Sequence, residues 1–242
     1  MDSAPRHRIA LVPPGAASVA WLDTTLRELQ GADLLQPVTI VAPSPYMVAV
    51  LRQRLAERGS ANVRFDVQLR PIAERIGRAR GSRAFARPLS GPLEDAAIRV
   101  AVRESAGSVL QPLAGNRSLQ ESLRSLFREL GHLEEDDAAL ELVAAGGSVG
   151  AAARRAYESY AALTQEFPDI PRQLRIAAHL AAESGSPWAA DLGPLVFYLP
   201  QRLDAAEQQF LHALARHVPL AIALPWLDDD DKIGRASCRE RV

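Results

Sequence analysis

Residues 7–22 read HRIALVPPGAASVAWL, and this stretch decides how the rest of the chain is interpreted. A short apolar run over residues 9–12 is typical of a buried strand, and the Pro-Pro-Gly sequence after it predicts a tight loop. Beyond Ser18 the apolar side chains recur at helical spacing, which indicates an amphipathic helix. This order of strand, loop and helix is where a nucleotide-binding α/β domain carries its phosphate loop.

A phosphate loop that binds ATP has three chemical requirements, and this loop lacks most of them. Glycines let backbone N–H groups reach the phosphates, a lysine contacts the β- and γ-phosphates, and a serine or threonine binds Mg²⁺. One glycine remains here and the lysine is absent, so the degenerate loop contains Pro13, Pro14, Gly15 and Ser18. We therefore expect no nucleotide cofactor, and a structural or nucleic-acid-handling role in place of ATP hydrolysis.

The composition limits the alternatives. With 242 residues, 48% of them hydrophobic, the chain can bury one sizeable core or form a sheet domain with a helical insertion. It contains no run of about 18 apolar residues and no signal-peptide pattern, so we expect a cytoplasmic protein with no membrane partner. One cysteine, Cys238, and five scattered histidines predict no metal site and no iron–sulfur cluster.

The basic residues are arginine with a single exception. Lys232 is the only lysine in the sequence, which argues against a Walker-type ATPase and against a PD-(D/E)xK nuclease. Pro168 and Asp169 resemble the start of that nuclease motif, but residues 171–173 read Pro-Arg-Gln where an acid and a lysine should follow. Because proline presets turn geometry, this segment predicts a turn between two helices.

Strand, loop and helix then recur along the chain. Residues 38–42 form a β-branched apolar run without polar alternation, as expected of a parallel strand covered on both faces. A helix over 46–58 follows, and residues 63–69 alternate like a strand before a short helix from residue 72.

From residue 93 to 183 the hydrophobic period is helical throughout, which predicts an inserted helical subdomain. Tyr157 and Tyr160 lie one helical turn apart in this block. Their spacing is more typical of core packing than of a base-stacking platform.

The sheet then resumes with apolar runs at residues 195–199 and 220–224. A helix between them begins at Asp204, where Glu207 stands at the capping-box position. In a P-loop ATPase the strand at 195–199 would end in acids for Mg²⁺ and water, but this one ends in Tyr198-Leu199-Pro200-Gln201. The second half of an ATPase site is therefore also missing.

The order of these parts resembles a known family. The motifs are ALVPPG at residues 10–15, PVTIVAPS at 37–44, NVRF at 62–65, SLFREL at 125–130, YESY at 157–160 and the run at 195–203. Together they are similar to the N-terminal helicase-like region of the B subunit of bacterial AddAB-type helicase–nucleases, over about residues 7–225. In that family the subunit helps to bind and process double-strand DNA ends for recombinational repair. Its helicase-like part is a scaffold that also recognises DNA sequence, and its iron–sulfur nuclease domain lies far downstream.

The resemblance implies an α/β fold with a P-loop NTPase-like, helicase 1A-like parallel sheet and an inserted helical subdomain. Strands from Ile9, Val38 and Leu195 should lie adjacent in that sheet. The expected division places the first part of the α/β domain at 1–92, the helical subdomain at 93–190, the return to the sheet at 191–227 and a non-native tail at 228–242.

Candidate DNA contacts follow from the loops at the carboxyl ends of strands, where open α/β sheets bind ligands. The segment 70–87 adds arginines balanced by Glu74 alone, although a solvated loop is an alternative for each position. Residues 228–242 hold four basic and five acidic residues, so the rest of the chain has 24 of each sign and no overall basic field. The candidates are Ser44, Tyr46, Arg70, Arg75, Arg78, Gln201 and Arg202.

The last residues are not expected to belong to the natural protein. Residues 232–242 look like the translation of a sequencing-adapter oligonucleotide, and residues 228–232 are alternatively an engineered protease site. We expect the chain to be a non-catalytic part of a longer parent, an ATP-dependent DNA exonuclease subunit. Its expected partners are DNA ends, a helicase–nuclease A-type subunit and the missing C-terminal domains of its own chain.

Two other classes stay open. One is a nucleotide- or small-molecule-binding protein of flavodoxin or Rossmann type, against which stand the absent Gly-x-Gly-x-x-Gly pattern and the absent His, Cys or acid clusters. The other is a protein-interaction scaffold.

Overall fold

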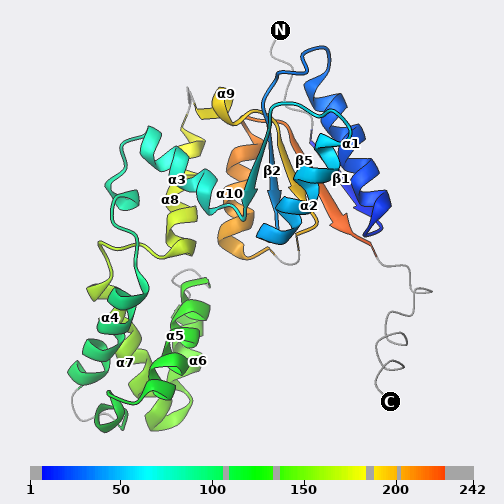
Figure 1. The fold of residues 1–242 in the computed structure, drawn as a ribbon. Coiled ribbons are helices and arrows are strands. Elements are labelled where there is room, and N and C mark those ends of the chain that lie inside the picture. Colours follow the sequence, from blue (N-terminus) through cyan, green and yellow to red (C-terminus); the bar gives the residue numbers. More distant parts are fainter. Residues whose placement is uncertain (1–6, 106–108, 133–136, 184–187, 201–202, 227–242) are drawn as a thin grey trace, which may run out of the picture. The chain divides into compact units, whose positions relative to one another are not determined.

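The fold was analysed in a computed structural model, which describes residues 7–105, 109–132, 137–183, 188–200 and 203–226 (Figure 1). These residues form an α/β fold with one parallel sheet, as the sequence predicts. Its strands are β1 (Arg8–Val12), β2 (Val38–Ala42), β3 (Val63–Val67), β4 (Leu195–Tyr198) and β5 (Leu220–Pro225).

Ten helices accompany the strands in the described residues. Those before the helical block are α1 (Ala16–Gln30), α2 (Pro45–Ala56) and α3 (Arg70–Ala79). The others are α4 (Gly91–Glu104), α5 (Arg117–His132), α6 (Asp137–Ala144), α7 (Gly147–Leu163), α8 (Ile170–Ala182), α9 (Trp188–Leu192) and α10 (Ala205–Ala215). Short 3₁₀ helices lie at η1 (Arg83–Phe85) and η2 (Gln111–Leu113).

The chain divides into two compact units. The sheet unit contains Met1–Ile72, Ala182–Leu203 and His212–Val242, and the helical unit contains Ala73–Ala181 and Asp204–Leu211. The first division therefore falls within α3, earlier than the boundary at residue 92 that the sequence suggests. Helix α10 is also shared, since its first turns belong to the helical unit and its end to the sheet unit.

The strand order is β1-β5-β4-β2-β3, and every neighbouring pair is parallel. Strands β2 and β4 are adjacent, as expected for Val38 and Leu195. The expectation that β1 would also adjoin them is wrong, because β5 lies between β1 and β4 and pairs Ile9 with Ile222. An apolar run predicts a buried strand but holds no information on which neighbour it meets.

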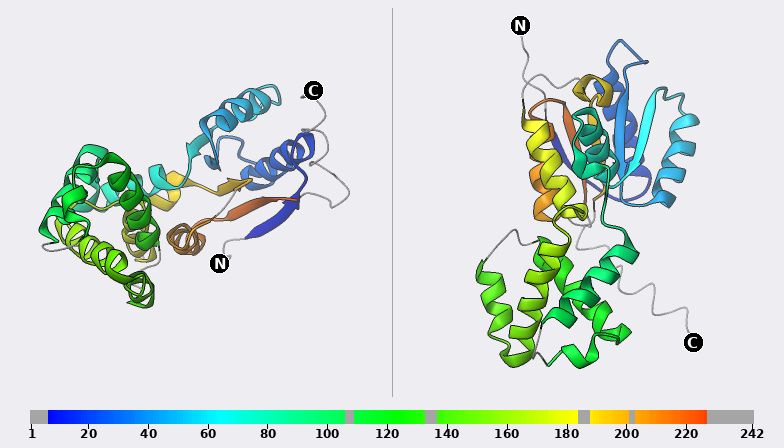
Figure 2. Two further views of the ribbon diagram at one scale, coloured as in Figure 1. Left: turned by 90° about the horizontal axis from the view of Figure 1, so that it is seen from below. Right: turned by 90° about the vertical axis from the view of Figure 1, so that its left-hand side faces the viewer.

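The connections between strands place the helices on the sheet. Right-handed crossovers from β1 to β2 and from β2 to β3 run in the same direction, so α1 and α2 cover the same face. Figure 2 shows both helices on one side of the strands. The core between these layers includes Leu22 and Leu26 from α1, Leu51 from α2 and the central strand residue Ile40.

All five residues of β2 are buried, which confirms a strand covered on both faces. Strand β1 differs because it lies at the edge of the sheet. Its Ile9 and Leu11 are 68% and 60% exposed, whereas Val12 is buried on the α1 side. One face of this edge is therefore uncovered in the described residues.

The helical unit has a core of its own, built mainly from α4, α5 and α7. Ile98, Phe127 and Ala156 are almost fully buried in it. Small alanines on α7 let α4 approach closely. Glu94 and Arg128 bridge α4 and α5 with a 3.0 Å hydrogen bond.

Helix α10 begins as predicted. The Glu207 backbone N–H donates to the Asp204 Oδ1 at 2.8 Å, and the Asp204 N–H donates to the Glu207 Oε2 at 3.1 Å. This reciprocal pair is a capping box, and Phe210 and Leu214 of the same helix are fully buried. No helix among the described residues is long and apolar enough to cross a membrane.

Candidate functional site

The loop after β1 has the backbone geometry of a tight strand-to-helix turn. Gly15 has φ +97°, a conformation that side-chain-bearing residues rarely adopt, and the Val19 N–H donates to its carbonyl at 3.3 Å. Gly15 is the N-cap of α1, which has no acidic side chain in its first turn. The loop is therefore a tight turn that leads directly from β1 into α1.

The hydroxyl of Ser18 makes two hydrogen bonds inside the protein. It donates to the Gly15 carbonyl at 2.8 Å and lies 2.7 Å from the Tyr198 hydroxyl. Because each hydroxyl has one hydrogen, the Tyr198 O–H is the donor in the second bond. Ser18 is 1% and Tyr198 2% exposed, and burial raises the pKa of the Tyr198 phenol above its ordinary value.

Ser18 and Tyr198 come from segments that lie far apart in the sequence. Ser18 is the third residue of α1, and Tyr198 is the last residue of β4. In this chain the two side chains bond to each other. Within the described residues, no group of three or more His, Cys, Asp or Glu side chains could hold a metal ion.

A cavity of about 450 Å³ opens beside this loop. Its wall is mostly apolar, and its charged residues are Arg54 and Arg58, which sequence reasoning did not single out. Both arginines face acids, since Arg54 lies 3.7 Å from Glu57 and Arg58 lies 3.3 Å from Asp23. Each guanidinium thus has a carboxylate neighbour in the same unit, although Asp23 also lies 3.2 Å from Arg27.

The candidates after β2 lie near the same cavity. Ser44 is the N-cap of α2 and its Oγ accepts the Met47 N–H at 3.2 Å, so its first role is structural. Tyr46 is 77% exposed. Met47 and Gly15 both line the cavity, which brings the loops after β1 and β2 together. Arg70 begins α3 and is the last of the candidates in the sheet unit.

Arg75 and Arg78 belong to the helical unit, so the structure does not gather all the candidates in one compact unit. The Arg78 guanidinium donates to Glu74 at 2.9 Å across one helical turn. Gln201 and Arg202 lie outside the described residues.

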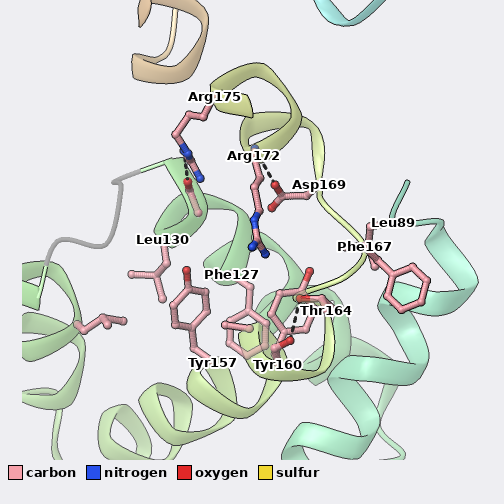
Figure 3. A pocket seen from close by; sticks show the side chains of 13 residues that line it. Leu89, Phe127, Leu130, Tyr157, Tyr160, Thr164, Phe167, Asp169, Arg172 and Arg175 are labelled. Atoms are coloured by element: carbon pink, nitrogen blue, oxygen red, sulfur yellow. Dashed lines mark hydrogen bonds between the residues drawn. The ribbon is translucent and has the colours of Figure 1, made fainter. Parts of the chain in front are cut away.

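A second cavity, of about 780 Å³, lies within the helical unit (Figure 3). Phe127 packs against Tyr160, with ring centroids 4.9 Å apart, and against the edge of Tyr157 at 5.4 Å. Tyr160 is 6% exposed, which confirms the expected core packing, and burial raises its pKa above the ordinary phenol value. Arg172 and Arg175 also line this cavity.

Arg172 was interpreted from the sequence only as part of a turn. The turn is real, because Asp169 accepts the Arg172 N–H at 3.0 Å where α8 starts. The sequence offers no local signal that the side chain of Arg172 lines a cavity. Arg83 and Arg87 fall in the basic segment 70–87 but were not chosen as candidates.

Comparison with known proteins identifies no relative: neither a protein-family model nor a curated protein sequence matches this chain.

Proposed function

We propose that this chain is a non-catalytic, helicase-like scaffold that binds DNA in a helicase–nuclease acting on double-strand DNA ends in recombinational repair. One observation carries the proposal: the buried hydrogen bond between Ser18 and Tyr198. It joins the two segments from which a motor protein would build its magnesium site. The loop leads from strand to helix as in a motor protein, but it lacks the lysine that ATP hydrolysis needs. This combination favours a helicase-like fold that binds DNA without hydrolysing ATP.

The cost of binding Mg–ATP at this loop explains why the frame is inactive. Mg²⁺ would need the Ser18 hydroxyl, which already serves Gly15 and Tyr198. Freeing it would leave the Tyr198 hydroxyl buried without a partner, a loss of about 1–3 kcal/mol. No lysine or acidic cluster in the described residues would offset that loss.

The sheet offers a surface suited to DNA at the carboxyl ends of β2 and β4. These strands are adjacent, and ligands of open α/β sheets bind where neighbouring connections leave for opposite faces. Ser44 and Tyr46 follow β2 at this edge, and Arg70 follows β3. An exposed tyrosine ring stacks on a base, and an arginine contacts a phosphate.

Fluorescence anisotropy with a forked-end duplex tests the proposal. Binding should weaken as salt rises, and Arg75→Ala with Arg78→Ala should reduce the slope of log K against log salt by about 2. Arg99→Ala with Arg155→Ala is the matched control, because both arginines are exposed on helices of the same unit. Equal changes in the two double variants would show that only general charge matters at Arg75 and Arg78. The absence of any DNA binding would refute the proposal.

The cavity beside Gly15 favours a second candidate, a nucleotide- or small-molecule-binding protein. Its volume of about 450 Å³ lies in the range of ligand sites, and Arg54 and Arg58 stand at its wall. Thermal unfolding with ATP or ADP, with and without Mg²⁺, separates the candidates. A rise in melting temperature that Arg58→Gln abolishes, together with no binding of DNA, would support this second function.

The uncovered edge of the sheet suits the protein partners of the proposal. Ile9 and Leu11 pair in register with Ile222 and Leu224, so these side chains lie on one face of neighbouring strands. Trp226, half exposed, continues β5 with its N–H donating to Val12 at 2.9 Å. Parallel sheets are usually covered on both faces, which supports a partner subunit or further domain at this edge.

A further inference from the structure

The aromatic cavity of the helical unit combines tyrosine and phenylalanine rings with a cation that has no protein partner in the described residues. Figure 3 shows the side chain of Arg172 reaching toward the rings of Phe127 and Tyr160. In the part of the chain that the structure describes, its guanidinium makes no hydrogen bond or ion pair, although the residue is partly buried. Ordering and partly desolvating an arginine without a partner costs free energy, so its position calls for an anionic ligand.

The local backbone makes the position of Arg172 more unusual. Arg172 lies in the first turn of α8, which contains no acidic residue. A cation is unfavourable at the N-terminus of a helix, where the backbone dipole is positive. The Asp169 carboxylate, which also lines the cavity, already caps this helix end by accepting the Arg172 N–H. A bound phosphate would therefore be held by the Arg172 guanidinium.

A second hollow adjoins Arg172 and extends the basic surface. Its volume is about 660 Å³, and it is lined by Arg83, Arg87 and Arg172 with Glu166 as the acid. Neither Arg83 nor Arg87 has an ion pair among the described residues. By contrast, Arg175, which lies three residues further along α8 and also lines the aromatic cavity, donates to the Gly131 carbonyl at 3.1 Å.

We propose that this cavity binds a nucleoside monophosphate unit, with its base against Tyr157 and its phosphate at Arg172. Planar aromatic side chains stack on bases, and a guanidinium binds phosphate oxygens in pairs. The volume of about 780 Å³ is within the range of small-molecule sites. The unit is either a free mononucleotide or the terminal nucleotide of a DNA strand, whose next phosphates would follow Arg83 and Arg87. Binding of a terminal DNA nucleotide rests on the proposed function, whereas binding of a free mononucleotide does not.

Fluorescence of 2-aminopurine distinguishes the sources. Three probes are used with the whole chain: 2-aminopurine deoxyribonucleoside monophosphate, a 5′-phosphorylated oligonucleotide with the fluorophore at its first position, and the same strand with the fluorophore in the middle. Stacking in the cavity should quench the terminal probe and leave the internal one unchanged. Quenching of the free monophosphate alone assigns the site to mononucleotides.

Variants then tie the signal to the cavity. Arg172→Gln should weaken binding of the responsive probe about tenfold or more, because a charge-assisted contact to phosphate is lost. Tyr157→Ala should abolish the quenching and Tyr157→Phe should keep it. Arg155→Gln, the same change at an exposed arginine of α7, should have no effect. Circular dichroism of each variant confirms that it folds, and Arg172→Lys keeps the charge while losing the paired geometry.

The outcomes separate this inference from the proposed function. If forked DNA binds with the expected salt dependence but neither probe is quenched, the cavity proposal is overturned and the scaffold proposal stands. If no DNA binds but the free monophosphate is quenched and Arg172→Gln abolishes the response, the cavity proposal stands and the scaffold proposal fails. Equal responses of Arg172→Gln and Arg155→Gln overturn the cavity proposal in either case.

Discussion

The arginines that line cavities differ between the sheet unit and the helical unit, although other arginines of the helical unit form ion pairs. Beside the loop after β1, Arg54 and Arg58 each face a carboxylate, and the Ser18 and Tyr198 hydroxyls are hydrogen-bonded to each other. In the helical unit, Arg83, Arg87 and Arg172 line open hollows and have no ion pair among the described residues. The arginines without an ion pair therefore lie away from the loop after β1, although that loop drew attention first in the sequence.

The largest expected effect tests how tightly the sheet unit is packed. Gly193 has φ +66°, and an added Cβ would lie 2.0 Å from the Pro37 carbonyl oxygen. We expect Gly193→Ala to lower the free energy of unfolding by about 3 kcal/mol or more, measured by urea denaturation. Gly59→Ala is the control, because Gly59 has φ +73° with open space around it and should cost about 1 kcal/mol. If both variants lost the same free energy of unfolding, the Pro37 backbone would have moved to make room for the added Cβ.

Alkaline pH should weaken both units through one buried tyrosine in each. Burial raises the pKa of Tyr198 and of Tyr160 above the value near 10 at which an unfolded tyrosine ionises. Their contribution to stability is therefore complete below pH 10 and is lost as pH rises through the native pKa. Between pH 10 and its native pKa, each tyrosine should lower the free energy of unfolding by about 1.4 kcal/mol per pH unit. Tyr198→Phe and Tyr160→Phe should each flatten the pH dependence, and an unchanged slope would contradict the assignment.

Glu94 is a buried carboxylate of the helical unit, and it forms ion pairs with two arginines. It is 7% exposed, accepts from Arg128 at 3.0 Å and lies 3.3 Å from Arg124. Glu94→Gln should destabilise the chain by about 2 kcal/mol, because Arg128 loses its ion pair and Arg124 keeps only its pair with Asp95. Arg128→Ala should cost less than about 1 kcal/mol, since that side chain is 61% exposed. Urea denaturation measures both.

Tyr198→Phe tests the bond that carries the proposed function. The Ser18 hydroxyl keeps its bond to Gly15, so the loss should be about 1–1.5 kcal/mol. A double-mutant cycle with Ser18→Ala should show coupling of at least about 0.5 kcal/mol. Neither variant should gain affinity for ATP, because the lysine and the acids are still missing. A gain of ATP binding would mean that the hydroxyl pair alone blocks the site.

The smallest effect is expected on the surface of the helical unit. Arg117 pairs with Glu121 at 2.9 Å while its own side chain is 91% exposed. Arg117→Ala should change the free energy of unfolding by about 0.3–0.5 kcal/mol, and less in high salt. Arg78→Ala, which removes a similar exposed pair, should match it in stability and differ by weakening the binding of forked DNA. Unchanged DNA affinity would remove Arg78 from the proposed contacts.

Local patterns in the sequence predicted where the elements lie. The apolar runs at 38–42 and 195–199, the Pro-Pro-Gly turn and the capping box at Asp204 each depend on neighbours within a few residues, and the structure has all of them. Helix α9 was missed because its five residues are too short for a helical period to show. The candidate residues Ser44 and Tyr46 were placed correctly at the end of a strand, yet Ser44 proved to be a helix cap.

The sequence by itself determined the alternation of strands and helices, the predominance of arginine among the basic residues and the absence of a lysine from the loop after β1. These are properties of short segments and of composition. Only the tertiary structure decided that β5 separates β1 from β4, that Ser18 meets Tyr198 across 180 residues, and that Arg172 stays unpaired beside an aromatic wall in the residues described. Those features depend on which distant segments meet when the core closes. Packing of the whole chain sets that choice, and no local pattern encodes it.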